Sequence, residues 1–219
     1  NRQAPGRDCS DAGEVGLEKK LKVRDADETR RRLLQAAKAE FAKNGLGGAR
    51  VDEISDRAQA NKRMLYHYFG SKDAYTVEVI ETYGQYFVKK LDRILTDQAI
   101  KPLDRLKVFA DEAAHGMEKY SFRRGCLVGS LAQELGALDD RIRSVLLETL
   151  QTWQGRIRTC LDEAKVAGDL APDANTTELS RLFWYTWEGA VLAAKLEKSR
   201  APLDIVSDSF QRHLTYLPP

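Results

Sequence analysis

The residues best suited to bind a nucleic acid lie in the segment 57–72. Arg57, Lys62, Arg63 and Lys72 occur there, and no acidic residue lies among them. Guanidinium and ammonium groups neutralise phosphates, and they donate hydrogen bonds to the guanine acceptors of the DNA major groove. An ordinary solvated surface has the same composition, so these charges alone leave both interpretations open.

The elements that would position these cations are two short helices joined by a tight turn. The spacing of apolar side chains predicts short helices over 51–57 and 62–69, between longer helices over 28–44 and 72–96. Asn61 is the expected N-cap of the second short helix. This order predicts a helix-turn-helix whose second short helix enters the major groove.

The expected contacts with DNA come from that second short helix and the residues beside it. Its first turn would bring Lys62 and Arg63 to base edges, whereas tyrosine hydroxyls and the Lys72 ammonium would contact phosphates. Phe69 is expected to pack in the hydrophobic core. The complete set of expected DNA-binding residues is Arg50, Asn61, Lys62, Arg63, Met64, Tyr66, His67, Tyr68 and Lys72.

The distribution of charge along the chain supports this interpretation. The whole sequence has 35 basic and 33 acidic residues, and the resulting net charge of +2 argues against a nucleic-acid-binding protein. Residues 1–75, however, hold 16 basic and 12 acidic residues, whereas residues 76–219 hold 19 basic and 21 acidic residues. A basic N-terminal part can therefore meet phosphates, while the rest of the chain has no electrostatic reason to do so.

Four stretches of the N-terminal part resemble a known family. The segments TRRRLLQAA (29–37), FAKNG (41–45), VDEI (51–54) and LYHYFGSKD (65–73) resemble the DNA-binding domain of TetR-type transcriptional repressors. Arg50 and Gln59 depart from the pattern, which usually has Ser or Thr and Gly at these positions. The resemblance implies a homodimer that binds double-stranded DNA at a palindromic operator.

The fold class expected from these observations is all-α, in three parts. Residues 1–24 are expected to form a flexible tail, 25–75 the helix-turn-helix DNA-binding domain (the head), and 76–219 a helical effector-binding and dimerisation domain (the body). Helices of the body are expected over 103–120, 125–135, 139–167, 177–198 and 203–214. The expected dimerisation residues, on the last two of these helices, are Leu182, Phe183, Ala190, Ala194, Val206 and Phe210.

Cys126 is the residue of the body with the clearest potential for chemistry. It follows Arg123 and Arg124 at the expected start of a helix. The helix dipole and nearby guanidinium groups both favour a thiolate, which attacks electrophiles and oxidants far better than a thiol does. A small buried packing residue is the alternative interpretation. Cys160 lies on the apolar stripe of its helix and is expected to be an inert buried thiol.

The surroundings of Cys126 resemble one branch of the same family. RGCLVGSL (124–131) and WEGAVLAAK (187–195) are similar to segments of the TetR-type repressors that respond to acrylate, N-ethylmaleimide and other reactive or unsaturated molecules. The resemblance implies that Cys126 senses the effector and that Lys195 lies near it. The full set of expected effector-sensing residues is Cys126, Lys195, Arg123, Arg124, Trp153, Trp184, Trp187 and Glu188.

These observations predict a dimeric repressor that leaves its operator when a small molecule acts near Cys126. Two alternatives stay open, namely a constitutive regulator with a non-covalent pocket or no effector, and an all-α enzyme with Cys126 as nucleophile. No metal or cofactor is expected, because His115 and His213 have no partners at metal-ligand spacing. No apolar run is long enough for a membrane helix, and three scattered cysteines suit a reducing cytoplasm.

Overall fold

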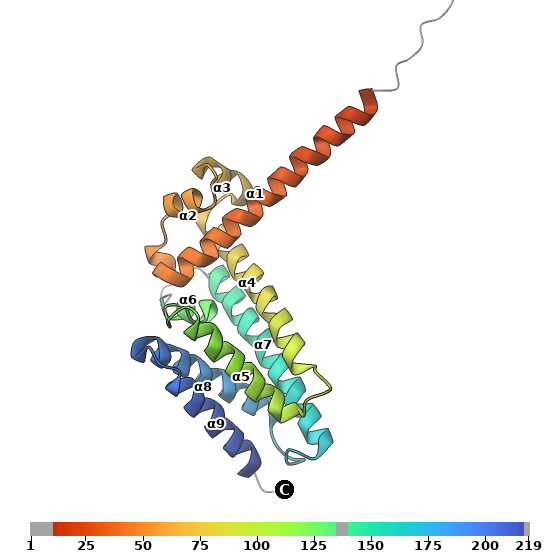
Figure 1. The fold of residues 1–219 in the computed structure, drawn as a ribbon, viewed down its shortest axis with the longest axis vertical. Helices are drawn as coiled ribbons and strands as arrows, with labels where there is room; N and C mark the ends of the chain where they lie inside the picture. The colour runs from red at the N-terminus through yellow and green to blue at the C-terminus, as the bar shows by residue number, and fades with distance from the viewer. Residues whose placement is uncertain (1–10, 135–139, 217–219) are drawn as a thin grey trace, which may run out of the picture.

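The fold of the described residues is entirely helical. A computed structural model describes residues 11–134 and 140–216, and within these ranges it contains helices, turns and loops (Figure 1). The first three helices form the head: α1 (Asp11–Gly48), α2 (Val51–Arg57) and α3 (Lys62–Phe69). Helices α2 and α3 have the limits that the sequence predicted, and the head is a helix-turn-helix.

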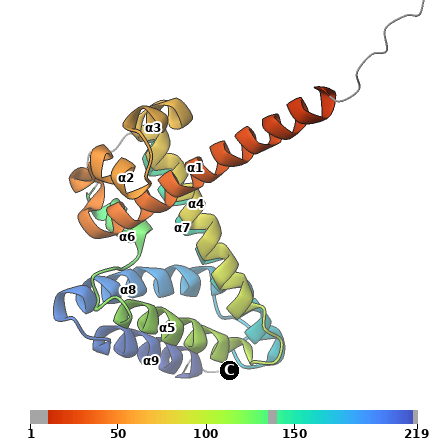
Figure 2. The same ribbon diagram turned by 45° about the horizontal axis from the view of Figure 1, so that its top comes forward.

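The N-terminal tail differs from its prediction. Residues 11–24 belong to α1, whose first part projects away from the rest of the molecule in both ribbon views (Figures 1 and 2). Leucine, lysine and glutamate in this stretch are good helix formers, so the helix extends even where the sequence has few large apolar residues. The rest of the predicted tail, 1–10, lies outside the described residues.

The end of α1 is set by glycine. The helical backbone breaks at Gly45, whose φ of 70° and ψ of 179° lie in a region that favours a residue without a Cβ. The non-glycine residue Gln59 has a φ of 51° in the turn between α2 and α3, as expected where the family usually has glycine. Arg50 makes no side-chain capping hydrogen bond to α2, so the weak cap expected there is present.

The body is a bundle of longer helices below the head. It consists of α4 (Lys72–Leu95), α5 (Pro102–Glu118), α6 (Leu127–Glu134), α7 (Asp140–Ala167), α8 (Thr176–Glu197) and α9 (Ala201–Tyr216). Helix α4 begins two residues after α3 and runs from the head along α7 into the body (Figures 1 and 2). Helix α4 therefore connects the recognition helix directly to the body.

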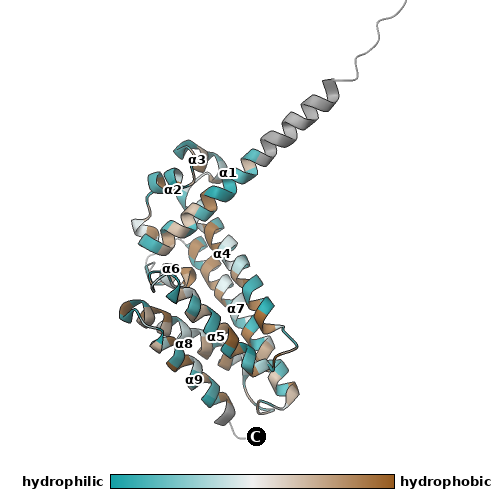
Figure 3. Ribbon diagram, viewed as in Figure 1, coloured by the Kyte–Doolittle hydropathy of each residue, from teal (hydrophilic) through white to brown (hydrophobic). Residues whose placement is uncertain are grey.

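An aromatic cluster forms the centre of the body. The indole of Trp153 is fully buried, and its ring centroid lies 4.4 Å from that of Phe87 and 5.3 Å from that of Trp184. Phe109 and Phe183 extend the cluster toward α9. Brown, hydrophobic segments recur along the helices of the body in Figure 3. Burying such rings from water is a major source of stability for a bundle of this size.

The dimerisation residues expected from the sequence are largely part of this core. Phe183, Ala190, Ala194 and Phe210 are 6% exposed or less within the single chain, so their side chains are already covered by the chain's own helices. Val206 is half-buried, and Leu182 is the exposed member of the set. The sequence pattern of α8 shows that both sides are apolar, but it does not tell which side faces the chain's own core.

Candidate functional site

The recognition helix α3 presents a polar face to solvent and an apolar face to the head. Leu65 and Phe69 are buried, and Tyr75 from α4 packs beside Phe69 and donates a hydrogen bond from its hydroxyl to the Leu33 carbonyl at 2.6 Å. The Asn61 side chain caps the helix by accepting the Arg63 backbone N–H at 2.9 Å. The cap and the buried residues together fix which side of α3 is available to DNA.

Most of the predicted DNA-binding residues are exposed to solvent. Asn61, Lys62, Arg63, Tyr66, His67, Arg50 and Lys72 are exposed, whereas Met64 and Tyr68 are half-buried. One cation already has a partner, since the Lys62 ammonium lies 2.8 Å from an Asp52 carboxylate oxygen. This contact raises the pKa of Lys62 and lowers that of Asp52, so both groups stay charged. A phosphate at Lys62 would compete with the Asp52 carboxylate.

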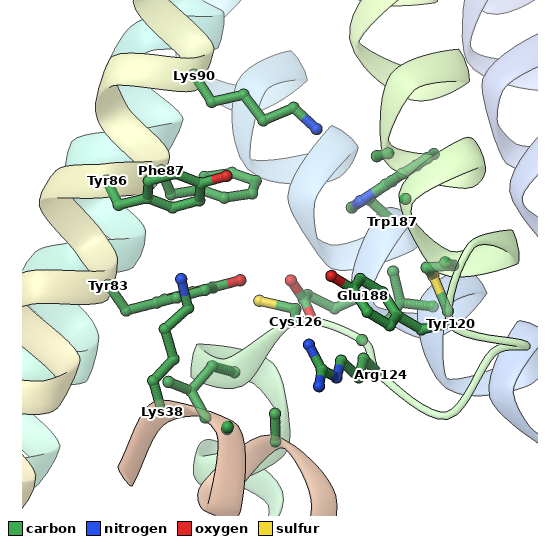
Figure 4. A pocket seen from close by; sticks show the side chains of 18 of the residues that line it. Lys38, Tyr83, Tyr86, Phe87, Lys90, Tyr120, Arg124, Cys126, Trp187 and Glu188 are labelled. Atoms are coloured by element: carbon green, nitrogen blue, oxygen red, sulfur yellow. The ribbon is translucent and has the colours of Figure 1, made fainter. Parts of the chain in front are cut away.

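A cavity of about 680 Å³ lies where the head meets the body (Figure 4). Its walls come from α1, α4, α5, α8 and the segment that precedes α6. The lining residues include Lys38, Tyr83, Tyr86, Phe87, Lys90, Tyr120, Arg124, Cys126, Trp184, Trp187 and Glu188. A volume of this size is typical of sites that hold drug-sized ligands.

Cys126 lies in the wall of this cavity, but its environment is the reverse of the predicted one. Its Sγ is directed toward the Tyr83 hydroxyl in Figure 4, and it accepts the Gly129 backbone N–H at 3.4 Å. Burial, followed by the Glu188 carboxylate, raises the pKa of the Cys126 thiol well above its usual value. The N–H groups at the start of α6 lower it, but by less, so the protonated thiol is the stable form.

The arginines expected to activate Cys126 are not among the groups that shift the pKa of its thiol. Arg123 and Arg124 are exposed, and the Arg124 guanidinium rests on the Tyr120 ring, 4.0 Å from its centroid. Arg124 lines the cavity, whereas Arg123 does not. The two arginines precede Cys126 directly in the sequence, but only the Arg124 side chain lines the cavity, where it contacts the Tyr120 ring.

Glu188 is the acidic group of the cavity. Burial raises the pKa of its carboxyl, an effect that a hydrogen bond with Cys126 partly offsets. Its Oε1 atom is buried and has no hydrogen-bond partner among the described residues. A Cβ added to Gly129 would collide with the Glu188 carboxylate, so a glycine at this position of α6 allows the carboxyl to approach Cys126.

The remaining expected sensing residues divide between cavity and core. Trp184 and Trp187 line the cavity, whereas the indole of Trp153 lies in the aromatic cluster behind it. The aliphatic part of the Lys195 side chain passes close to Gly125. If Gly125 were replaced by alanine, the new Cβ would lie only 3.1 Å from Lys195 Cδ. Lys195 is thus close to the residue that precedes Cys126.

Among the cavity residues that sequence reasoning missed are Lys38, Lys90 and Tyr83. Lys38 belongs to the head and lies far from Cys126 in the chain. Burial is the main reason that the pKa values of both lysines are lowered. Polar residues on amphipathic helices normally face solvent, so the sequence contains no signal that these side chains enter a cavity.

The fold and the two sites define a DNA-binding regulator with an internal cavity. Residues 33–78 match the model for the bacterial regulatory proteins of the tetR family, and residues 102–210 match the tetracyclin repressor-like C-terminal domain. The chain belongs to the TetR family of transcriptional regulators, and it acts as a transcriptional repressor of this type rather than as an enzyme.

Individual relatives agree with this family. The chain is 40% identical to the transcriptional regulator AcuR of Cereibacter sphaeroides over 189 residues, which is 86% of each protein. A crystal structure of a regulatory protein TetR from Rhodobacter sphaeroides, also 40% identical, superposes with a TM-score of 0.81 over 84% of this chain and 98% of that one. The crystal structure of the reduced form of Escherichia coli NemR is 22% identical and shares the fold. Its TM-score is 0.79, and the match covers 84% of this chain and 95% of the NemR chain.

Two further properties concern the ranges 11–134 and 140–216. None of their helices combines the length and the apolar character needed to cross a membrane. The same ranges hold no cluster of three or more histidine, cysteine, aspartate or glutamate side chains that could bind a metal ion.

Proposed function

We propose that the protein binds a palindromic operator as a homodimer and leaves it when a small molecule acts in the cavity beside Cys126. The observation that carries this proposal is the composition of the cavity wall. Lys38 comes from α1 of the head, Tyr83 from α4, and Cys126 from the segment before α6. A molecule in the cavity therefore touches the elements that hold the recognition helix.

Helix α6 offers a second connection between cavity and head. It begins at Leu127, directly after Cys126, and ends at Glu134. The Glu134 carboxylate accepts the backbone N–H of Leu46 at 2.7 Å and that of Gly47 at 3.3 Å, in the last turn of α1, which follows the break at Gly45. A shift of α6 on ligand binding would move this turn. The ligand would favour the conformation to which it binds more tightly, and operator affinity would fall if that conformation spaces the two heads differently.

The proposed dimer uses the exposed side of α8 together with α9. Large apolar residues repeat along this side at helical spacing, and their exposure in the single chain is unusual for such side chains. They are Leu182, Tyr185, Leu192 and Leu196 on α8, with Ile205 on α9. Packing this side against its copy would form a four-helix interface and hold the two recognition helices about 34–36 Å apart, one turn of DNA.

The effector class that the family resemblance implies is an electrophile, and the cavity supplies a base for its capture. In this route the Cys126 thiol gives its proton to the Glu188 carboxylate as the sulfur bonds to the β-carbon of an unsaturated carbonyl compound. The α-carbon then takes a proton, and a stable thioether remains. The hydrogen bond between the two side chains provides the proton path.

A non-covalent effector is the second candidate, and the high pKa of the Cys126 thiol favours it. A thiol that stays protonated reacts slowly, so binding without a bond is a direct alternative. Both candidates give the same repressor and differ in whether sulfur is modified.

A gel-shift experiment on the operator DNA, with intact-protein mass spectrometry, tests the proposal. Under the covalent route, N-ethylmaleimide releases the wild type, which gains one adduct mass more than the Cys126→Ser variant, and that variant stays bound. The matched control Cys160→Ala removes a buried thiol outside the cavity and should respond as the wild type does. Equal release of wild type and Cys126→Ser would exclude covalent sensing at Cys126.

A further inference from the structure

Two cations of the cavity rest on aromatic rings instead of carboxylates. The Lys38 ammonium lies 4.2 Å from the centroid of the Tyr86 ring and 5.3 Å from that of Tyr83. Arg124 sits on Tyr120 in the same way. Within the described residues neither cation has an ion-pair partner, whereas Lys90 lies 3.9 Å from the Glu112 carboxylate. The positive charge of Lys38 and Arg124 is therefore not neutralised by the protein.

The two cations also disfavour one another. Burial is the first cause that lowers the pKa of Lys38, and the nearby positive charge of Arg124 is the second. An anion placed between the two groups would reverse both effects, because it attracts each cation and reduces their repulsion. Lys38 reaches the cavity from α1 and Arg124 from the segment before α6 (Figure 4), so the anion would bridge the head and the body.

The rest of the cavity is suited to a flat apolar group. Tyr83, Tyr86, Phe87, Trp184 and Trp187 contribute aromatic side chains to its walls. Trp184 is 1% exposed, and its indole Nε1 has no hydrogen-bond partner among the described residues. A flat aromatic ring can stack on walls of this kind.

From this geometry we infer that the cavity takes an aromatic organic anion, bound without a covalent bond between Lys38 of the head and Arg124 of the body. The inference rests on the proposed function and specifies its effector. The cavity of about 680 Å³ is large enough for a ring and a side chain together with the acid group. Cys126 is a neighbour of this ligand and is not needed to hold it.

Calorimetric titration of the full-length protein with 3-phenylpropanoate tests the inference. This acid has an aromatic ring and no double bond conjugated to its carboxylate, so Cys126 cannot add to it. We expect the acid to bind and its uncharged amide to bind at least about tenfold more weakly, as loss of a charge-assisted contact would cause. Octanoate, an aliphatic anion, should also bind more weakly than the aromatic acid.

Variants of the two cations give the matching result on the protein side. Lys38→Gln and Arg124→Gln should each weaken binding of 3-phenylpropanoate about tenfold, and Lys38→Arg should restore most of the affinity that Lys38→Gln loses. Lys43→Gln is the matched control, because Lys43 is an exposed lysine of the same helix and does not line the cavity.

Several results would overturn the inference. They are equal affinity for acid and amide, stronger binding of octanoate, or unchanged binding by Lys38→Gln and Arg124→Gln. Operator release by N-ethylmaleimide without any binding of 3-phenylpropanoate would also overturn it and leave the proposed function intact. Binding of 3-phenylpropanoate that depends on Lys38 but leaves the operator complex unchanged would support the ligand class and contradict the proposed release mechanism.

Discussion

The contact between Glu134 and the last turn of α1 leads to a specific prediction about how the head is held. The Glu134→Ala change removes an acceptor from the Leu46 N–H at 2.7 Å and from the Gly47 N–H at 3.3 Å. A hydrogen bond to a charged group contributes about 1.5–3 kcal/mol when well shielded. Here the contact is exposed and the second bond is long, so we expect about 1 kcal/mol, or roughly fivefold in a local opening equilibrium.

Hydrogen exchange measured by NMR on the Leu46 and Gly47 amides is the direct assay. In Glu134→Ala both amides should exchange roughly fivefold faster, since opening of the turn no longer breaks these two bonds. Glu148→Ala, which removes an exposed carboxylate on α7, is the control and should leave both rates unchanged. Unchanged exchange in Glu134→Ala would refute the claim that α6 holds this turn, and with it the second connection between cavity and head.

Further predictions concern DNA, the dimer and the thiol. Arg63→Ala should reduce affinity for the operator but not for random DNA, with an unchanged dimer by sedimentation; equal operator binding would show that the recognition side of α3 is misplaced. Lys72→Ala should weaken binding to every DNA sequence. It should also reduce, by about one unit, the steepness with which the logarithm of the binding constant falls with the logarithm of the salt concentration, as measured by anisotropy titration. Leu196→Asp, a change at a residue 76% exposed in the single chain, should shift sedimentation toward the monomer while circular dichroism retains the helical signal. Because the pKa of Cys126 is raised, its alkylation by N-ethylmaleimide should be slower at neutral pH than that of a free thiol and should accelerate with pH into a more alkaline range; a rate that levels off near the pKa of an ordinary thiol would contradict this.

Much of the fold could be predicted from the sequence because the relevant signals are local. Apolar spacing and the Asn61 cap predicted α3 with its observed limits, and the side chain of Asn61 does accept the Arg63 N–H. The helices of the body were likewise predicted to within about three residues at each described end. The start of α1 was not predicted, because residues 11–24 favour a helix by their propensity but have no apolar stripe that would indicate one.

The chemistry of the cavity could not be predicted in this way. Sequence neighbours Arg123 and Arg124 suggested an activated thiolate at Cys126, but through-space neighbours decide a pKa. The groups that matter are the protein atoms that bury the sulfur and the carboxylate of Glu188, which comes from α8. Burial and a negative charge both act against the thiolate.

The sequence by itself determined the class of protein, an all-helical TetR-type repressor with a basic DNA-binding head, because periodicity, caps and motifs are encoded within short segments. Only the tertiary structure decided which side of α8 is core and which is left exposed at Leu192 and Leu196. It also brought Lys38 of the head beside the cavity that contains Cys126. Burial and electrostatic surroundings depend on contacts between distant segments, and these exist only once the helices have packed.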